Sequence, residues 1–497
     1  MRLRPAAARH TALVAAAALT AATATMATGA ATAGAGTAPG PVLKLKVAQD
    51  SITVQSFHGR VFLNPGIWLA SLHSPLVFRV HRVSYTKPIT ITQLIPVSSH
   101  VTVNRPLPGS LLDGFNGLKN FMTMTMRNSA GKVVVNQKIT FCPNTFDPEK
   151  VTPTGPTASP YPQECGFDPF PKGMVWGIQK GWAVNPLNVF GGLLLKLPVG
   201  RYRVTDTITP AYVRLFHIAH SDATASVKVK VVKATRCCGA SAPRTRAHGG
   251  PLPPAPRVPT LRTPPMSARP DLVPLPSWNI VTTHQRSSGK DFLDFGATVW
   301  VGGNSRLDVQ GFRSGGTPVM RAFQYFWRNG HLIGRARAGT MGFDTRTGHN
   351  HWHFEQFAAY RLLNNSKSLV VRSHKQGFCI APSDPVDILL RNSTWKPSQV
   401  GFFGACGNPA ALWVREMLPI GWGDTYFQFL AGQSFDITHV PNGSYFIEVI
   451  ANPKKVLFET NTRNDISLRR VILGGTPGHR TVKVPAWHGI DPEGLHR

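Results

Sequence analysis

The sequence has no long hydrophobic run after its first residues and is poor in acidic side chains. A membrane-spanning helix needs about 20 consecutive apolar residues, and no stretch after residue 34 approaches that length. We therefore expect no transmembrane segment. Asp and Glu number 24 against 54 Lys and Arg, a formal net charge of +30. This excess favours anionic cell-wall or surface polymers as partners, or it is a general surface property that serves solubility. No nucleic-acid-binding motif is found in the sequence.

The first residues have the composition of a secretory signal peptide. Three arginines, at positions 2, 4 and 9, precede an Ala/Val/Leu run from Thr11 to about Met26, and small residues follow. A basic start, a short apolar core and small residues are typical of such a signal. We predict a signal peptide over residues 1–34 and a secreted, extracellular protein.

Cysteine is also scarce, with six in 497 residues. Their spacing does not match a Cys-rich zinc site. An even number in an exported chain permits disulfides, and the grouping predicts Cys142 with Cys165 and Cys379 with Cys406. Adjacent cysteines close only a strained ring, so Cys237–Cys238 is either free or joins two chains.

Short segments rich in β-branched residues alternate with turn residues through most of the chain, which predicts an all-β protein. We expect a β-sandwich-like N-terminal domain over 42–234, of unknown role, and a C-terminal β-sandwich catalytic domain with long loops over 269–475. A Pro/Arg-rich linker is predicted over 235–268 and a flexible tail over 476–497. These two regions are dense in Pro, Gly and Arg.

Two smaller patterns bear on how the halves are built. A Pro-x-Gly-x-Tyr sequence occurs at 198–202 and again at 441–445, which indicates similar β-hairpin construction in both halves. In the first half, His217 and His220 are three residues apart. On a strand they would face opposite sides, so a surface or strand-end role is favoured over metal binding.

Three histidines alternate in the segment Gly348–His353, at positions 349, 351 and 353. Alternate residues share one face of a strand, whereas on a helix they diverge by about 200°. A straight strand would place the outer two Cα atoms about 13 Å apart, so a common ion requires irregular backbone there. Imidazole suits copper and zinc. The triplet alone fits a copper site, a hydrolytic zinc site or a chance cluster on a solvated strand.

Further motifs follow the triplet in a fixed order. The segment 373–379 is Ser-His-Lys-Gln-Gly-Phe-Cys, 423–426 is Gly-Asp-Thr-Tyr, and 459–464 is Glu-Thr-Asn-Thr-Arg-Asn. This ordered set resembles the catalytic domain of the lysyl oxidase family, across about 200 residues within 269–475. The first half of the chain lies outside the resemblance.

The resemblance implies a copper-dependent amine oxidase. By residue, it implies that His349, His351 and His353 bind copper, and that Lys375 and Tyr426 become the lysine tyrosylquinone cofactor. The implied reaction converts primary amines, as peptidyl lysine or small amines, to aldehydes. It consumes dioxygen and releases hydrogen peroxide and ammonia.

Other candidate residues have more than one interpretation. Asp424 is a candidate general base or a turn residue, and His374 either orients Lys375 or faces solvent. The resemblance also implies a possible calcium site, in which Asn461 replaces a usual aspartate and so removes one charged ligand. Its residues would be Asp271, Leu272, Glu459, Asn461 and Asn464.

Two features leave the catalytic interpretation open. The segment between Lys375 and Tyr426 is longer than in animal members of the family and lacks most of their cysteines. A strongly basic surface also repels lysine-rich substrates, which favours acidic or neutral proteins with isolated lysines, or wall-associated amines. The alternative function is a secreted copper-binding protein without catalysis, attached to an anionic surface.

Overall fold

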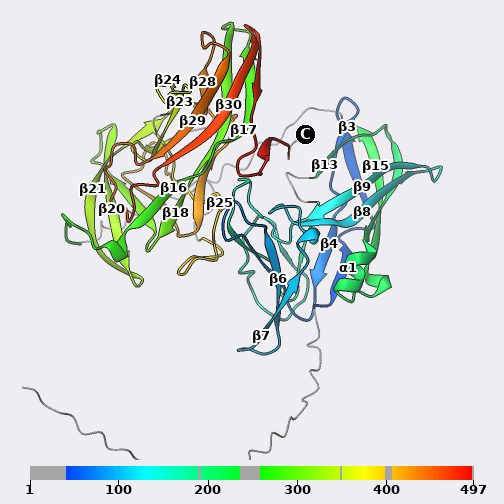
Figure 1. Ribbon diagram of the computed structural model, residues 1–497. Helices are drawn as coiled ribbons and strands as arrows, with labels where there is room; N and C mark the ends of the chain where they lie inside the picture. Colours follow the sequence, from blue (N-terminus) through cyan, green and yellow to red (C-terminus); the bar gives the residue numbers. More distant parts are fainter. Residues whose placement is uncertain are drawn as a thin grey trace, which may run out of the picture. The chain divides into compact units, whose positions relative to one another are not determined.

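The computed structural model describes residues 41–187, 192–234, 258–346, 350–375, 377–397 and 406–494. These described residues belong to one compact unit. Regular structure in the described residues is almost entirely β-strand, which confirms the all-β prediction (Figure 1). The predicted signal peptide and the pair Cys237–Cys238 lie outside the described residues. No helix in the described ranges has the length and apolar character needed to cross a membrane.

The first half, residues 41–234, contains fifteen of the described strands and one short helix, α1 (Pro210–Leu215). The strands are β1 (Leu43–Val47), β2 (Ser51–Ser56), β3 (Arg60–Leu63), β4 (Ile67–Ser71), β5 (Leu76–His81), β6 (Thr90–Pro96), β7 (Thr102–Leu107), β8 (Leu118–Asn128), β9 (Val133–Phe141), β10 (Glu149–Lys150), β11 (Gly173–Ile178), β12 (Trp182–Val184), β13 (Leu193–Lys196), β14 (Gly200–Ile208) and β15 (Thr224–Lys233).

These strands form sheets of order β1-β4-β12-β10, β11-β5-β6-β7, β13-β3 and β2-β15-β14-β8-β9. Their sequences alternate as a sheet with one buried face requires. In β15, Val227, Val229 and Val231 are buried while Lys228 and Lys230 between them are exposed. The buried faces meet in one hydrophobic core drawn from residues between Leu43 and Val231.

The second half, residues 258–494, has sixteen described strands. They are β16 (Pro270–Pro274), β17 (Trp278–Gln285), β18 (Lys290–Gly303), β19 (Leu307–Phe312), β20 (Val319–Arg328), β21 (His331–Asp344), β22 (His351–Phe354), β23 (Ala358–Leu363), β24 (Leu369–Arg372), β25 (Asp384–Pro385), β26 (Trp413–Leu418), β27 (Trp422–Tyr426), β28 (Ser434–Asp436), β29 (Gly443–Ala451), β30 (Ile466–Thr476) and β31 (His479–Lys483).

Three sheets result, with orders β16-β18-β27-β25, β22-β21-β20-β19-β26 and β24-β23-β29-β30-β31; β17 and β28 also pair with β18. A second hydrophobic core lies among them and is drawn mainly from residues between Leu272 and Leu473. The division into two domains at the predicted boundaries remains a prediction.

The repeated Pro-x-Gly-x-Tyr pattern has the same structural role in each half. The Tyr202 hydroxyl donates a hydrogen bond to the Pro198 carbonyl at 2.9 Å, and the Tyr445 hydroxyl donates to the Pro441 carbonyl at 2.8 Å. In both cases the tyrosine lies in the strand that follows the turn. Its hydrogen bond therefore ties the turn to that strand. The two halves therefore share this turn, but the predicted hairpin is wrong in both, because β13 pairs with β3 and β28 pairs with β18 and neither pairs with the strand after the turn.

Both predicted disulfides are present, Cys142–Cys165 and Cys379–Cys406. The second one joins the segment after Lys375 to a point before β26. It therefore closes the long segment between Lys375 and Tyr426 on itself, as the sequence predicts.

Three other sequence predictions differ from the structure. Residues 479–483, in the predicted flexible tail, form β31 against β30, because their alternating side chains suit a sheet edge. Residues 258–268, in the predicted linker, lie on the second half, where the Leu261 N–H donates to the Arg335 carbonyl. His217 and His220 are exposed as predicted but follow α1 instead of lying on a strand.

The two halves contact each other beside β27. The Lys172 N–H donates to the Val386 carbonyl at 2.6 Å, and the Ile388 N–H donates to the Gly173 carbonyl at 2.8 Å. The Phe167 N–H donates to the Asp384 carboxylate at 2.6 Å. Since Asp384 lies on β25, which pairs with β27, the first half supports the sheet that carries Tyr426.

Candidate functional site

The side chains of Lys375 and Tyr426 meet in the interior of the second half. Tyr426 ends β27 and pairs with Ala297 of the long strand β18. Its side chain is 3% exposed and that of Lys375 is 4% exposed. The Lys375 Nζ lies 4.3 Å from the centroid of the Tyr426 ring. The fold therefore brings an amine and a phenol ring together away from solvent.

The tyrosine is held by the backbone near Lys375. The Cys379 N–H donates a hydrogen bond to the Tyr426 hydroxyl oxygen at 2.7 Å. The Phe378 ring packs edge-on against the Tyr426 ring, with centroids 5.1 Å apart. These two contacts fix the orientation of the phenol with respect to the segment that carries the lysine.

The lysine is placed by small residues around its stem. Gly432 has a φ of +88°, and a Cβ there would lie 3.2 Å from the Cα and Cβ of Lys375. The Lys375 N–H donates to the Ser373 hydroxyl at 3.1 Å, and that hydroxyl donates to the Gly432 carbonyl at 2.5 Å. Any side chain at 432 would therefore displace the lysine.

The charge state of Lys375 follows from its surroundings. Among the described residues, its Nζ has no hydrogen-bond partner. Burial and then the Arg346 charge lower the pKa of Lys375, the carboxylates of Asp424 and Asp344 oppose the shift, and the result is about 8. A substantial fraction of the amine is therefore neutral near physiological pH, the form in which an amine is nucleophilic.

Two buried carboxyl groups lie near the tyrosine. Asp424 is on β27 and Glu416 on β26, and both are almost fully buried. Burial raises the pKa of each carboxyl well above its usual range, and each raises the pKa of Tyr426 further. The positive charge of Lys375 opposes this rise in the pKa of Asp424. Asp424 is thus the carboxyl electrostatically coupled to the lysine, and its position suits proton transfer.

Two of the three histidines lie on one short strand. His351 and His353 are on β22, which pairs with the end of β21, and their ring centroids are 4.7 Å apart. Asn350 has a φ of +53° directly before the strand, so the backbone is irregular there, as predicted. His349 lies outside the described residues. Within the described ranges, no three His, Cys, Asp or Glu side chains form a metal-binding group.

The histidine strand contacts the lysine segment. The backbones of Phe354 and Phe378 exchange two hydrogen bonds, at 2.8 and 3.0 Å. A Cβ at Gly377 would lie 2.7 Å from the His353 Cβ, so only glycine allows this approach. Histidines, lysine and tyrosine thus converge from β22, the segment after β24, and β27.

Sequence reasoning missed several residues of this site. The Asp344 carboxylate lies 3.3 Å from the His353 Nδ1 and also binds Arg346. A carboxylate on the second ring nitrogen of a metal-binding histidine is a common arrangement. Glu416 and Gly432 belong to no recognised motif, so no signal in the sequence marks them. His374 is exposed, as its solvent-facing alternative predicts.

The predicted calcium ligands are only partly brought together. The Leu272 N–H donates to the Glu459 carboxylate at 2.9 Å, and the Asn464 amide donates to the Asp271 carboxylate at 3.1 Å. Asn461 instead accepts a hydrogen bond from the N–H of residue 463, at 3.2 Å. Burial raises the pKa of Glu459 to about 8.

A missed acidic residue also belongs to this cluster. Asp465 is next to Asn464, and burial followed by the Asp271 charge raises its pKa to about 6. Among the described residues, the Oδ1 atoms of Asp271, Asn464 and Asp465 have no hydrogen-bond partner. Unpaired carboxylate and amide oxygens are the ligands that a hard cation prefers, but the acidic side chains of this cluster do not form a metal-binding group in the described residues.

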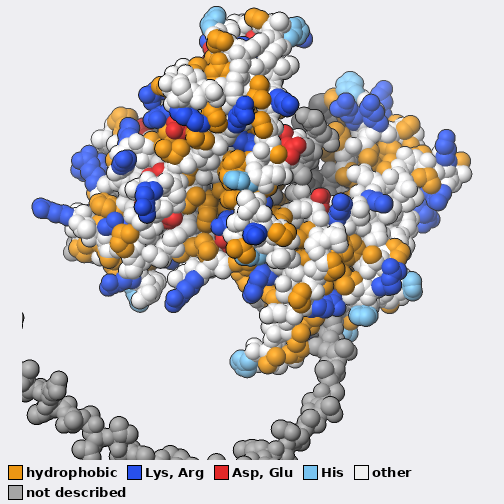
Figure 2. All heavy atoms as spheres, in the orientation of Figure 1, with side chains coloured by type: hydrophobic (Ala, Val, Ile, Leu, Met, Phe, Trp, Pro, Cys, Tyr) orange, Lys and Arg blue, Asp and Glu red, His pale blue; other side chains and the backbone are white. Residues whose placement is uncertain are grey.

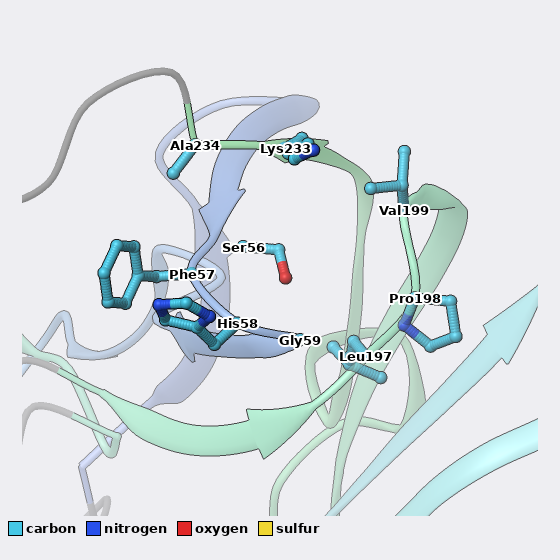
Figure 3. Close-up of a pocket in the computed structure, with 9 residues that line it drawn as sticks. All are labelled: Ser56, Phe57, His58, Gly59, Leu197, Pro198, Val199, Lys233 and Ala234. Carbon is cyan, nitrogen blue, oxygen red and sulfur yellow. The ribbon is translucent and has the colours of Figure 1, made fainter.

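A separate cavity of about 360 Å³ in the first half has no such chemistry (Figure 3). It lies between the β2–β3 turn and the turn before β14. His58, with a φ of +48°, and Lys233 are its only titratable side chains. We assign it no role.

Comparison with known proteins places the second half in context. Residues 316–479 match the family described as lysyl oxidase. Lysyl oxidase homolog 2 of Xenopus tropicalis is 28% identical over 149 residues, covering 30% of this chain and 18% of that protein. Lysyl oxidase homolog 4 of Bos taurus is 30% identical over 141 residues, covering 27% and 17%. The chain thus matches less than a fifth of the length of these relatives. The predicted resemblance to the lysyl oxidase family is confirmed for this segment.

Proposed function

We propose that this chain, whose residues 316–479 match the lysyl oxidase family, is a secreted copper-dependent amine oxidase. Its substrates would be primary amines, as peptidyl lysine or small amines, which it would convert to aldehydes while releasing hydrogen peroxide and ammonia. The observation that carries the proposal is the buried Lys375 Nζ, 4.3 Å from the Tyr426 ring. A lysine and a tyrosine at this distance suit the formation of a shared covalent cofactor.

The histidines would hold the metal. His349, His351 and His353 would bind copper, and the Asp344 carboxylate would fix the ring orientation of His353 from 3.3 Å. When bound, copper would supply, with dioxygen, the oxidising chemistry that converts a tyrosine ring to a quinone able to take up electrons from an amine.

The other site residues would handle protons and geometry. Lys375 supports this role because burial and Arg346 lower its pKa to about 8, so a minority of the amine is neutral at physiological pH and able to form a bond to the ring, far more than for an ordinary lysine. The Cys379 N–H holds the Tyr426 oxygen in place. Asp424 would act as the general base that removes a proton from the substrate carbon. Both faces of β22 are buried, which would keep bulk water from the reacting atoms.

The acidic cluster would bind calcium in the same half. Asp271, Leu272, Glu459 and Asn464 would contribute to the site, and Asn461 would not, because its side chain caps its own turn. The unpaired oxygens of Asp271 and Asn464 support this assignment. The site would stabilise the fold and not take part in the reaction.

Calcium is expected to raise the thermal unfolding temperature of the protein. At a concentration 100 times the dissociation constant, a bound ligand stabilises by about 2.7 kcal/mol. Glu459→Gln removes one charge of the cluster and is expected to abolish most of the shift, measured by calorimetry with calcium and with a chelator. Glu448→Gln, a mostly buried carboxylate paired with Arg361, is the matched control. An equal calcium shift in both variants would exclude this site.

The direct test of the proposed function is the mass of the peptide that contains Lys375 and Tyr426. Protein loaded with copper in air is expected to yield one covalently linked peptide pair that also gives a quinone redox stain. Protein kept free of copper should yield two separate peptides. Separate, unmodified peptides from copper-loaded protein would contradict the proposal and favour the non-catalytic copper-binding alternative. Zinc as the retained metal would favour a hydrolytic site.

A further inference from the structure

A second cavity lies in the catalytic half, away from the lysine and tyrosine. Its volume is about 590 Å³, within the range of about 300–1,000 Å³ typical of small-molecule sites. Four loops form it: the β18–β19 turn, the β20–β21 turn, the β26–β27 turn and residues 391–397. The last of these belongs to the long segment between Lys375 and Tyr426.

The cavity is strongly cationic. Arg306, Arg391 and Lys396 line it, and its lining includes no Asp or Glu. Within the described residues, none of these three side chains has a salt bridge to a carboxylate. The buried Asp308 nearby is already bound by Arg415 and by the Trp327 indole N–H. Three like charges around one cavity repel each other, and an anion in the cavity would remove this repulsion.

One of the cations is held in a fixed position. The Arg306 guanidinium lies over the Trp327 ring, 4.7 Å from its centroid, and its Nη1 contacts the Met417 sulfur at 3.7 Å. A stacked guanidinium keeps its remaining N–H donors in a rigid, planar arrangement that suits oxyanions. The Arg306 side chain is therefore already ordered in the free protein, so binding costs little of its conformational entropy.

The rest of the lining suits a sugar. Met417, Pro419 and Ile420 give an apolar, buried floor. Three amide side chains lie at the rim, two of them in turns with left-handed backbone: Asn304, Asn329 and Asn392. Amides can donate to and accept from hydroxyl groups, while an apolar floor accommodates the C–H face of a ring. A free inorganic ion would leave most of this cavity unused.

We propose that this cavity binds a saccharide that carries a phosphate or sulfate group. The cations come from two separate loops, which suits a tetrahedral group with three acceptor oxygens better than a planar carboxylate. The Arg306 guanidinium would bind the oxyanion, and Arg391 and Lys396 would add positive charge. The Lys396 ammonium donates to the Ser159 carbonyl at 3.3 Å, a neutral acceptor that leaves its charge uncompensated. This site gives the long segment between Lys375 and Tyr426 a binding role, and it is consistent with the +30 charge of the chain.

The sugar site is distinct from the proposed amine-oxidising site. The cavity is at the β20–β21 turn, near His331, whereas Asp344 at the other end of β21 contacts His353. Along β26 and β27 the two sites are closer, because Ile420 in the cavity lining precedes Tyr426 by six residues, at most about 20 Å of extended chain. Saccharide binding would therefore anchor the protein to a phosphorylated or sulfated glycan without occupying the amine site.

Calorimetric titration of the full chain tests the proposal. Glucose 6-phosphate or glucose 6-sulfate is expected to bind one site per chain, and unmodified glucose, glucuronate and inorganic phosphate are each expected to bind at least 10-fold more weakly. Comparison of the first two distinguishes the phosphate from the sulfate source. Binding of inorganic phosphate or glucuronate as tight as that of the sugar phosphate would overturn the proposed ligand.

Variants locate the site. Arg391→Ala with Lys396→Ala removes two exposed charges and is expected to weaken binding at least 10-fold. Arg321→Ala with Lys454→Ala removes the same charges from exposed positions outside the cavity and is expected to change binding less than 2-fold. Asn392→Asp, which keeps a side chain that tolerates the φ of +64°, is expected to weaken binding through repulsion. Unchanged affinity in the cavity variants would exclude this site. The conclusion is the same whether or not the protein has amine oxidase activity.

Discussion

Replacing Tyr426 by phenylalanine is expected to abolish amine-dependent peroxide release. Phenylalanine has no ring oxygen, so it cannot be oxidised to the quinone by the route that copper and dioxygen supply. The Cys379 N–H would also lose its acceptor at 2.7 Å, which costs about 1–3 kcal/mol of stability for a buried donor. The measurement is peroxide production with benzylamine and with a lysine-containing peptide, on copper-loaded protein.

A second tyrosine in the same core provides the control. Tyr360 is buried and packs against Phe378, the residue that also contacts Tyr426. Tyr360→Phe therefore imposes a comparable change in packing without touching the proposed cofactor, and we expect it to retain most of the activity. Peroxide release by Tyr426→Phe at the wild-type rate would refute the quinone mechanism.

Asp424→Asn is expected to lower kcat by about 10²–10⁴-fold, the usual contribution of a general base, while the Lys375–Tyr426 cross-link still forms. The amide has nearly the same volume as the buried carboxyl, so the packing of β27 is preserved. It cannot accept the substrate proton, however. The measurement combines steady-state kinetics with the mass of the cross-linked peptide.

This combination separates catalysis from cofactor formation. If Asp424 has only a structural role, its variant should lose the cross-link together with the activity, or lose neither. Asp436→Asn is the matched control, because Asp436 is a carboxylate of the same half that pairs with Lys290 near the surface. We expect its kinetics to match those of the unmodified protein.

Several features of the fold could be predicted because the patterns that specify them are local. Alternating valines and lysines specify a half-buried strand at 227–231 whatever surrounds it, and the structure has that strand. The histidine spacing predicted a strand with irregular backbone, and β22 begins directly after the left-handed Asn350. The cysteine grouping predicted both disulfides. Motif order along the chain was sufficient to predict the resemblance to the lysyl oxidase family that residues 316–479 show.

Other features could not be predicted, because they depend on residues far apart in the sequence. Composition predicted a flexible tail, yet residues 479–483 pair with β30, since an available sheet edge outweighs weak local propensity. Glu416 and Gly432 belong to no motif. Each matters only because the fold places it beside the lysine or the tyrosine.

The sequence by itself determined the all-β class, the two disulfides and the resemblance of one segment to lysyl oxidase. Only the tertiary structure decided whether the side chains of Lys375 and Tyr426 meet. Cys379 and Tyr426 are 47 positions apart, and no spacing rule relates them. The pairing of β27 with β18, the space at Gly432 and the burial around Lys375 together set the 4.3 Å approach of the amine to the ring and the lowered pKa of the lysine. The lowered pKa depends on exclusion of water by segments far apart in the sequence, which a linear pattern does not encode.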